Sequence, residues 1–157
     1  MKRFIIGFIK DVDKDWCAIL DCKHKRHFRH HPPFYEREWT QSLAGRRQHL
    51  GMEVECQKCE MPKLPEGLEP YRVTDDLKDM GVARELLNER KFKEGVWAKI
   101  IIRTGHLKFI VGTPSAKTFV LNNEFYGILP PKGDYSIEAL PDLEFFIEFY
   151  QKTKVEA

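Results

Sequence analysis

The sequence predicts a mainly β protein with short helices, in which a small metal-stapled αβ module precedes a β-sandwich or small barrel. Two observations predict this. All four cysteines lie in the first 59 residues, where Cys22-x-His24 and Cys56-x-x-Cys59 form two short pairs of potential metal ligands. After residue 63 the chain alternates short β-rich runs with Gly, Pro and Asn turns, which is typical of a sandwich or a barrel.

The first two β-rich runs, residues 4–9 and 16–20, predict a β-hairpin around a polar turn. The second of these strands ends just before Cys22 and His24, so the hairpin delivers the first ligand pair.

The second ligand pair follows a predicted helix and a short strand. Residues 40–49 predict the helix, which Thr40 or Ser42 can cap and Gly51 ends. Residues 52–55 then predict a strand that leads directly into the second pair.

A stretch rich in Pro and Gly at residues 61–67 marks the domain boundary. We therefore divide the chain into a zinc-binding module over 1–62, a barrel domain over 63–151 and a frayed tail over 152–157. In the barrel domain, residues 82–89 predict a helix. The predicted strands are 96–103, 107–111, 118–121, 125–129, 135–139 and 144–150.

Charge and hydropathy limit the class of protein. Residues 1–62 hold 12 Lys/Arg against 9 Asp/Glu, so this part is mildly basic, well short of a dedicated nucleic-acid binder.

No run reaches the ~20 apolar residues of a membrane span. The apolar start reads as a strand rather than a signal segment, so we expect a cytoplasmic protein with no membrane contact. Clustered cysteines in a reducing compartment favour metal over disulfides.

The metal set predicted from spacing is Cys22, His24, Cys56 and Cys59, with Zn²⁺ as the ion and His27 as the alternative histidine. The competing interpretation is a buried thiol pair with surface histidines. A redox role for Cys56-x-x-Cys59 is less favoured because no clear helix begins at Cys56. Cys17, on a predicted strand, is expected to be a packed thiol.

The number of ligands decides the chemistry. A zinc ion with four protein ligands has no open position for substrate, so such a site holds the fold and we predict no catalytic residue. With three ligands, a bound water would restore hydrolytic chemistry.

Residues 23–31 form a cationic loop that offers a second use for the module. Its lysines and arginines could contact phosphates, and Phe28 or Tyr35 could stack on a base. The alternative is a solvated loop around the metal, whose long side chains cover apolar surface.

The N-terminal part resembles a small uncharacterised bacterial domain family with the pattern W…CGHxQHxRHxPP…W…G…CxxC. The resemblance covers roughly residues 1–60 and departs where Lys23 replaces the usual glycine between the first two ligands. It supports the zinc interpretation and implies no activity. The matching residues are Trp16, Cys22, His24, His27, Arg29, His30, Pro32, Pro33, Trp39, Arg46, Gly51, Cys56 and Cys59.

The C-terminal part resembles the cupin-type domain found at the N-terminus of some tellurite-resistance protein B methyltransferases. The resemblance covers about residues 64–151 and implies a single cupin-like β-barrel or jelly roll. No methyltransferase domain follows it here, so we expect no methyl transfer. The matching residues are Leu64–Gly67, Pro70, Tyr71, Leu86, Leu87, Gly95, Trp97, Lys99, Ile100, Gly105, Leu107, Pro130, Pro131 and Glu148–Tyr150.

Two departures from the cupin pattern change the expected site. Arg90 and Tyr135 stand where that family carries histidines that look like metal ligands, and a protonated guanidinium cannot bind a cation. We therefore expect a metal-free barrel. Arg90, Trp97, Lys99 and Tyr135 could line its mouth and bind a small anionic ligand. The alternative is a filled barrel in which Trp97 is core.

Three functions remain open from the sequence. The first is a non-enzymatic two-module protein that binds a small anion, in a response to tellurite, other oxyanions or metals. The second is a nucleic-acid-associated protein that uses the basic module. The third is a small cupin-type enzyme, for which no clear catalytic set exists because His106 sits in a predicted turn. Cupin-like barrels often pair edge to edge, so a homodimer is one expected form.

Overall fold

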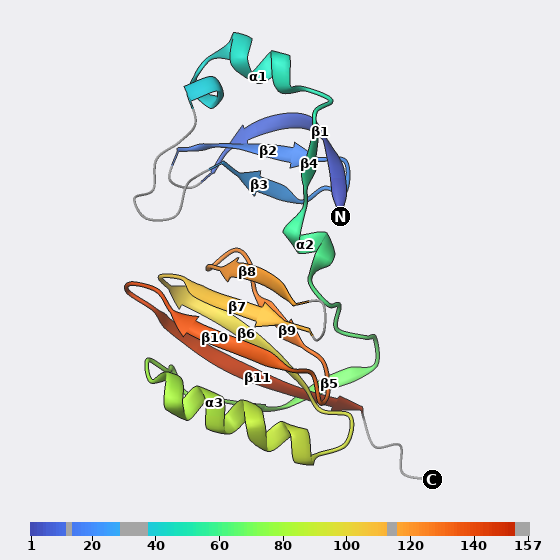
Figure 1. The fold of residues 1–157 in the computed structure, drawn as a ribbon, viewed down its shortest axis with the longest axis vertical. Coiled ribbons are helices and arrows are strands. Elements are labelled where there is room, and N and C mark those ends of the chain that lie inside the picture. Colours follow the sequence, from blue (N-terminus) through green and yellow to red (C-terminus); the bar gives the residue numbers. More distant parts are fainter. Residues whose placement is uncertain (12–13, 29–37, 113–115, 153–157) are drawn as a thin grey trace. The chain divides into compact units, whose positions relative to one another are not determined.

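A computed structural model of the chain describes residues 1–11, 14–28, 38–112 and 116–152. It divides into two compact units, Met1–Glu60 and Met61–Ala157. The protein is mostly β, as the sequence predicted (Figure 1). No helix in the described part of the chain is long and apolar enough to cross a membrane.

The first unit is built on a four-stranded sheet of order β3-β2-β1-β4. The strands are β1 (Lys2–Lys10), β2 (Trp16–Leu20), β3 (Lys25–His27) and β4 (Glu53–Glu55). The predicted hairpin is confirmed as β1 and β2, which pair antiparallel, and β4 pairs with the other side of β1. This central place of β1 brings the segments after β2 and β4 to the same region of the unit.

Three short helical segments complete the first unit: η1 (Glu38–Gln41), α1 (Leu43–His49) and α2 (Gln57–Glu60). Ser42 is the N-cap of α1, and its side chain accepts a hydrogen bond from the Gly45 amide at 3.0 Å. Gly51 has φ +79°, the left-handed conformation that a residue ending a helix needs. Both predicted boundary signals are confirmed.

The core of the first unit is small. Only a few side chains form it, namely Ile5, Ala18, Leu20, Phe28, Val54 and Cys56, with Phe8, Cys22, Trp39 and Cys59 packed against them. Two of the predicted ligands therefore belong to the edge of the core, and one lies inside it. A unit of about 60 residues buries a limited fraction of its surface and is marginal without a staple.

The second unit surrounds a larger core with two antiparallel sheets, a half-barrel rather than a closed barrel (Figure 1). The sheets have the orders β10-β7-β8 and β5-β11-β6-β9. The strands are β5 (Leu68–Val73), β6 (Trp97–Thr104), β7 (Leu107–Val111), β8 (Lys117–Leu121), β9 (Gly127–Leu129), β10 (Tyr135–Ala139) and β11 (Glu144–Lys152).

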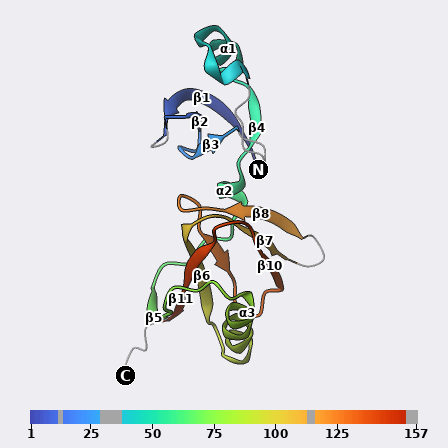
Figure 2. The same ribbon diagram turned by 90° about the vertical axis from the view of Figure 1, so that its left-hand side faces the viewer.

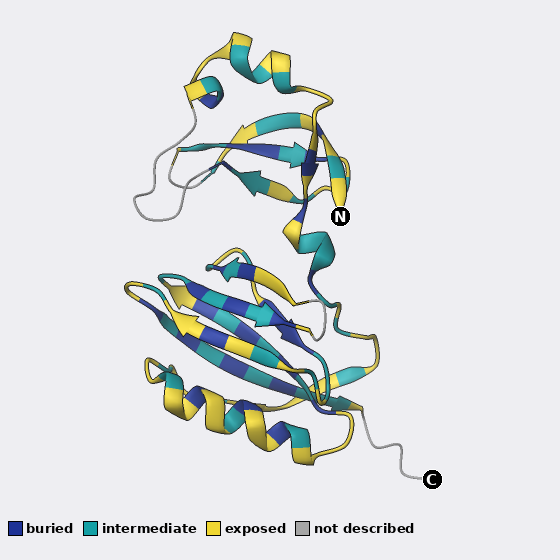
Figure 3. Ribbon diagram, in the orientation of Figure 1, coloured by how far each residue is buried: buried dark blue, intermediate teal, exposed yellow. Residues whose placement is uncertain are grey.

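Alternating burial along the long strands shows which face meets this core (Figure 3). In β6 every second residue from Ala98 to Ile102 is buried, and in β11 Phe145, Ile147 and Phe149 are buried. This is the period-2 pattern of strands with one face inward. The fold class predicted from these runs, a β-sandwich or barrel, is confirmed.

The helix α3 (Met80–Glu89) lies against β10 at the edge of the three-stranded sheet (Figure 2). Asp79 caps it, because its carboxylate accepts hydrogen bonds from the amides of Gly81 and Val82. Ala83 and Leu87 face the core. A short 3₁₀ turn, η2 (Arg90–Phe92), follows and turns Arg90 inward.

Candidate metal centre

The first ligand pair sits on the tight turn that follows β2. The Lys23 amide donates to the Leu20 carbonyl at 2.8 Å, and the Leu20 amide donates to the His24 carbonyl at 2.9 Å. Lys23 has φ +72°, the left-handed region that glycine adopts without cost. The departure from the family's glycine at this position therefore leaves the turn intact and places strain on one residue.

The second ligand pair lies where β4 ends. The Cys56 amide donates to the Met1 carbonyl at 2.8 Å, which extends the pairing of β1 and β4, and α2 starts at the next residue. One turn of helix then carries Cys59 back towards Cys56. The expectation that no clear helix begins at Cys56 is wrong. A helix of four residues is too short to give a periodic pattern in the sequence. The objection to a redox role must therefore rest on the other ligands.

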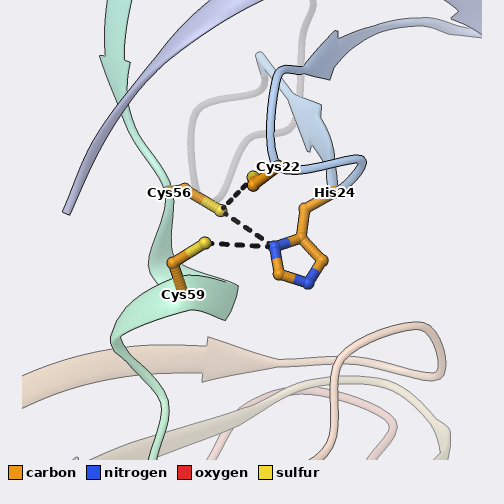
Figure 4. Close-up of side chains that lie close together, drawn as sticks. All are labelled: Cys22, His24, Cys56 and Cys59. Atoms are coloured by element: carbon orange, nitrogen blue, oxygen red, sulfur yellow. Dashed lines mark hydrogen bonds between the residues drawn. The ribbon is translucent and has the colours of Figure 1, made fainter.

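The four predicted ligands converge (Figure 4). Their ligand atoms all lie within 4.8 Å of one another. The Cys22 and Cys56 sulfurs are 3.7 Å apart, and Nδ1 of His24 lies 3.4 Å from the Cys56 sulfur and 3.3 Å from the Cys59 sulfur. The group could hold a metal ion.

These distances suit tetrahedral coordination. With metal–sulfur bonds of about 2.3 Å and metal–nitrogen bonds of about 2.0 Å, a tetrahedral angle separates two sulfurs by about 3.8 Å and a sulfur from a nitrogen by about 3.5 Å. The observed separations of 3.7 Å and of 3.3–3.4 Å are close to both values. A redox pair needs only two sulfurs, so the approach of Cys22 and His24 favours a metal centre.

The thiols of Cys56 and Cys59 differ in the direction of their pKa shifts. Burial is the main cause that raises the pKa of the Cys56 thiol to about 11. Burial also raises the pKa of Cys59, but hydrogen bonds involving Arg3, Cys22 and Cys56 outweigh it and the net pKa is lowered. Arg3 was not predicted as part of the site, since only the pairing of β1 with β4 brings it there.

The alternative ligand His27 lies elsewhere. Its Nδ1 is 3.2 Å from a carboxylate oxygen of Asp11, and it belongs to β3 rather than to the turn. Cys17 is fully buried, with its sulfur 3.4 Å from the Ile9 carbonyl, which confirms the prediction of a packed thiol.

Two side chains of the cationic loop are less available for nucleic-acid contacts than the sequence predicted. Phe28 is buried and packs edge-on to Trp39 at 4.9 Å, so it cannot stack on a base. Arg26 donates a hydrogen bond to the Glu55 carbonyl. Lys23 and Lys25 are exposed. Arg29, residues 30–31 and Tyr35, along with 153–157 of the predicted tail, lie outside the described residues.

In the second unit, the structure brings two of the four predicted ligand-binding residues together. The Arg90 guanidinium lies 5.8 Å from the centre of the Tyr135 ring. Burial raises the pKa of Tyr135 although Arg90 and Arg84 oppose it, and its hydroxyl donates to Asn88 Oδ1 at 2.7 Å. This pair thus lies among side chains of α3.

Trp97 and Lys99 lie in β6. Trp97 packs against the core cluster, and the Lys99 ammonium sits 4.3 Å from the centre of the Tyr126 ring. No hydrogen bond or ring contact among the described residues joins either side chain to Arg90. A single ligand site made of all four residues stays a prediction.

Comparison with known proteins agrees with this two-part organisation. The model of a family of unknown function (DUF3565) matches residues 6–63. A TehB-like domain matches residues 74–147. The first match contains all four candidate ligands, and the second contains both sheets of the half-barrel apart from β5 and the end of β11. Among curated proteins no relative matches the chain.

One solved structure is similar in fold. It is the crystal structure of a protein from E. coli (strain K12), a structural genomics target, with a TM-score of 0.52 and 17% sequence identity. The match covers 62% of this chain and 94% of that chain. At this identity the likeness concerns the fold alone.

Proposed function

We propose that this is a non-enzymatic cytoplasmic protein in which a structural zinc ion holds the first unit and the TehB-like unit binds a small anion. The observation that carries the zinc proposal is the convergence of three sulfurs and one ring nitrogen within 4.8 Å of one another, with three of their separations close to tetrahedral values. Thiolate and imidazole donors in this ratio are typical of Zn²⁺, whereas Mg²⁺ and Ca²⁺ prefer oxygen.

A structural role follows from the number and burial of the donors. Four protein ligands fill a tetrahedron and leave no position for an activated water. Cys56 is only 3% exposed, so substrate has no approach through that side of the centre. Because the core of the first unit is small, a bound metal ion would add stability that the core alone does not supply.

The anion proposal for the second unit begins with Arg90. It stands where the resembling cupin domains carry a histidine, and its guanidinium donates to the carbonyls of Pro130 and Gly133 at 3.0 and 2.9 Å. A guanidinium cannot ligate a metal but attracts anions. The TehB-like match supports a role in a response to tellurite or related oxyanions.

Metal analysis of the purified full chain tests the zinc proposal. We expect about one zinc per chain and a loss of most of it in the Cys59→Ala variant, while Cys17→Ala, whose thiol is buried away from the centre, keeps it. Absence of zinc from the wild-type chain, or a different metal at full occupancy, would overturn the proposal.

A further inference from the structure

The side chain of Arg3 reaches the candidate metal centre from β1. Arg3 pairs with Val54 of β4, two residues before Cys56, and the Cys56 amide donates to the Met1 carbonyl at 2.8 Å. This pairing places the start of β1 beside the second pair of candidate ligands. Spacing in the sequence could not assign Arg3 to the centre, because it lies far from both pairs along the chain.

The Arg3 guanidinium contacts two sulfurs. It forms a hydrogen bond with the sulfur of Cys59, and its Nη2 donates to the thioether sulfur of Met1 at 2.9 Å. The hydrogen bond with Cys59 is the main cause that raises the pKa of Arg3, and the charges of Cys59 and Cys22 add to it although burial opposes them. A planar guanidinium carries five N–H donors, so it can hold both sulfurs at once.

The donor set of the centre gives this cation an electrostatic role. Three thiolates and one neutral imidazole around a divalent ion leave one net negative charge. Arg3 supplies one positive charge in hydrogen-bond contact with one of the three sulfurs. Hydrogen bonds between ionised groups are roughly twice as strong as those between neutral groups, so the contact strengthens once the sulfur is a thiolate.

We infer that Arg3 is a positioning residue of the metal centre: its guanidinium holds the Cys59 sulfur, offsets the negative charge of the thiolates and thereby strengthens zinc binding. The inference rests on the proposed zinc ion and adds to the site a residue that is not itself a ligand. Hydrogen-bond partners of metal ligands typically change metal affinity 10- to 100-fold.

Lys2 provides a matched control on the same strand. It carries the same charge as Arg3, but it is exposed, whereas Arg3 is half-buried. Successive residues of a strand point to opposite faces, so Lys2 and Arg3 differ in direction rather than in charge or distance along the chain. Loss of Lys2 therefore reports general charge attraction, and loss of Arg3 reports the contact with Cys59.

Zinc affinity of the full-length chain is the first measurement, by competition with a chelator at fixed pH and with thiols reduced. Arg3→Met keeps much of the apolar stem but removes the donors, and it should weaken zinc binding roughly 10- to 100-fold. Arg3→Lys keeps the charge and should lose about two- to ten-fold. Lys2→Met should stay within about two-fold of the wild type.

The second measurement reports the sulfur itself. In the cobalt-loaded full-length chain, the sulfur-to-cobalt charge-transfer band should move to lower energy in Arg3→Met, because a thiolate that loses a hydrogen bond gives up its electrons more readily. Arg3→Lys should show a smaller shift in the same direction, and Lys2→Met none. A general loss of folding stability leaves the band of the loaded centre where it is.

The outcomes separate this inference from the proposed zinc site. A wild-type chain that binds no zinc would overturn both. A zinc-binding wild type with unchanged affinity and band in Arg3→Met would overturn the role of Arg3 alone, as would equal losses in Lys2→Met or a weaker affinity without a band shift. If Arg3→Met takes up no cobalt, the two measurements on Arg3→Lys decide in the same way.

Discussion

If the proposed zinc ion is bound, its removal should unfold the first unit and spare the second. Four large side chains, Ile5, Leu20, Phe28 and Val54, make up most of the buried core of the first unit. At about 1.5–3 kcal/mol for each buried side chain, they contribute about 6–12 kcal/mol. The ordering of a 60-residue chain opposes this with a far larger entropy, so the core alone leaves little or no net stability.

The proposed zinc ion would change that balance. Structural zinc sites in small domains contribute on the order of 10–16 kcal/mol near pH 7, which is comparable to or larger than what this core supplies. The second unit buries many more side chains, among them Phe109, Phe119 and Phe145. Its stability therefore does not depend on the metal centre.

The assay is a ¹H–¹⁵N correlation spectrum of the full chain before and after a zinc chelator, with thiols kept reduced. We expect signals of residues 1–60 to collapse to unfolded positions, those of 61–152 to stay dispersed, and added zinc to restore the first set. Cys17→Ala serves as the matched control and should behave like the wild type. Dispersed signals from a metal-free, fully reduced first unit would refute the reasoning.

Three further predictions concern single side chains. Lys23→Gly should stabilise the first unit by up to about 1 kcal/mol in denaturant titrations, because it removes the left-handed strain at φ +72°, and an unfavourable change would contradict that strain. Phe145→Ala should destabilise the second unit by about 3–5 kcal/mol, whereas Phe92→Ala, at a side chain 92% exposed, should stay within about 0.5 kcal/mol; equal losses would contradict the assigned core. Burial and then the hydrogen bond to Glu148 raise the pKa of Tyr150 from 10.0 to about 12, so stability should fall between these pH values as only the unfolded chain ionises; Tyr150→Phe should flatten that part of the profile.

Local pattern was sufficient for most strands but not for the edges of the sheets. The predicted runs 107–111 and 135–139 coincide with β7 and β10, since every second residue of β7 is buried and Tyr135 and Ile137 lie on the inner face of β10. β5 was missed since its residues are almost all exposed and it includes Pro70. Its pairing with β11 depends on residues 75 to 84 positions away, which no local window contains.

The candidate sites also combine features that are local in sequence with features that depend on the folded chain. The candidate metal ligands could be brought together from the sequence because each pair is local and soft donors at such spacing are specific. Arg90 was noticed only through its place in the family pattern, and its burial was not foreseen. The hydrogen bonds that hold it there escaped prediction because their acceptors, the carbonyls of Pro130 and Gly133, lie 40 and 43 positions away in sequence.

Pro70 also bears on how this protein can associate. β5 is the outer strand of its sheet, and an outer strand with free amides is a template for pairing with another chain. Proline offers no amide there, and the neighbouring Glu69 and Arg72 carry charge. Strand addition along β5 is therefore disfavoured, which protects the sheet from aggregation and directs any self-association to a different surface.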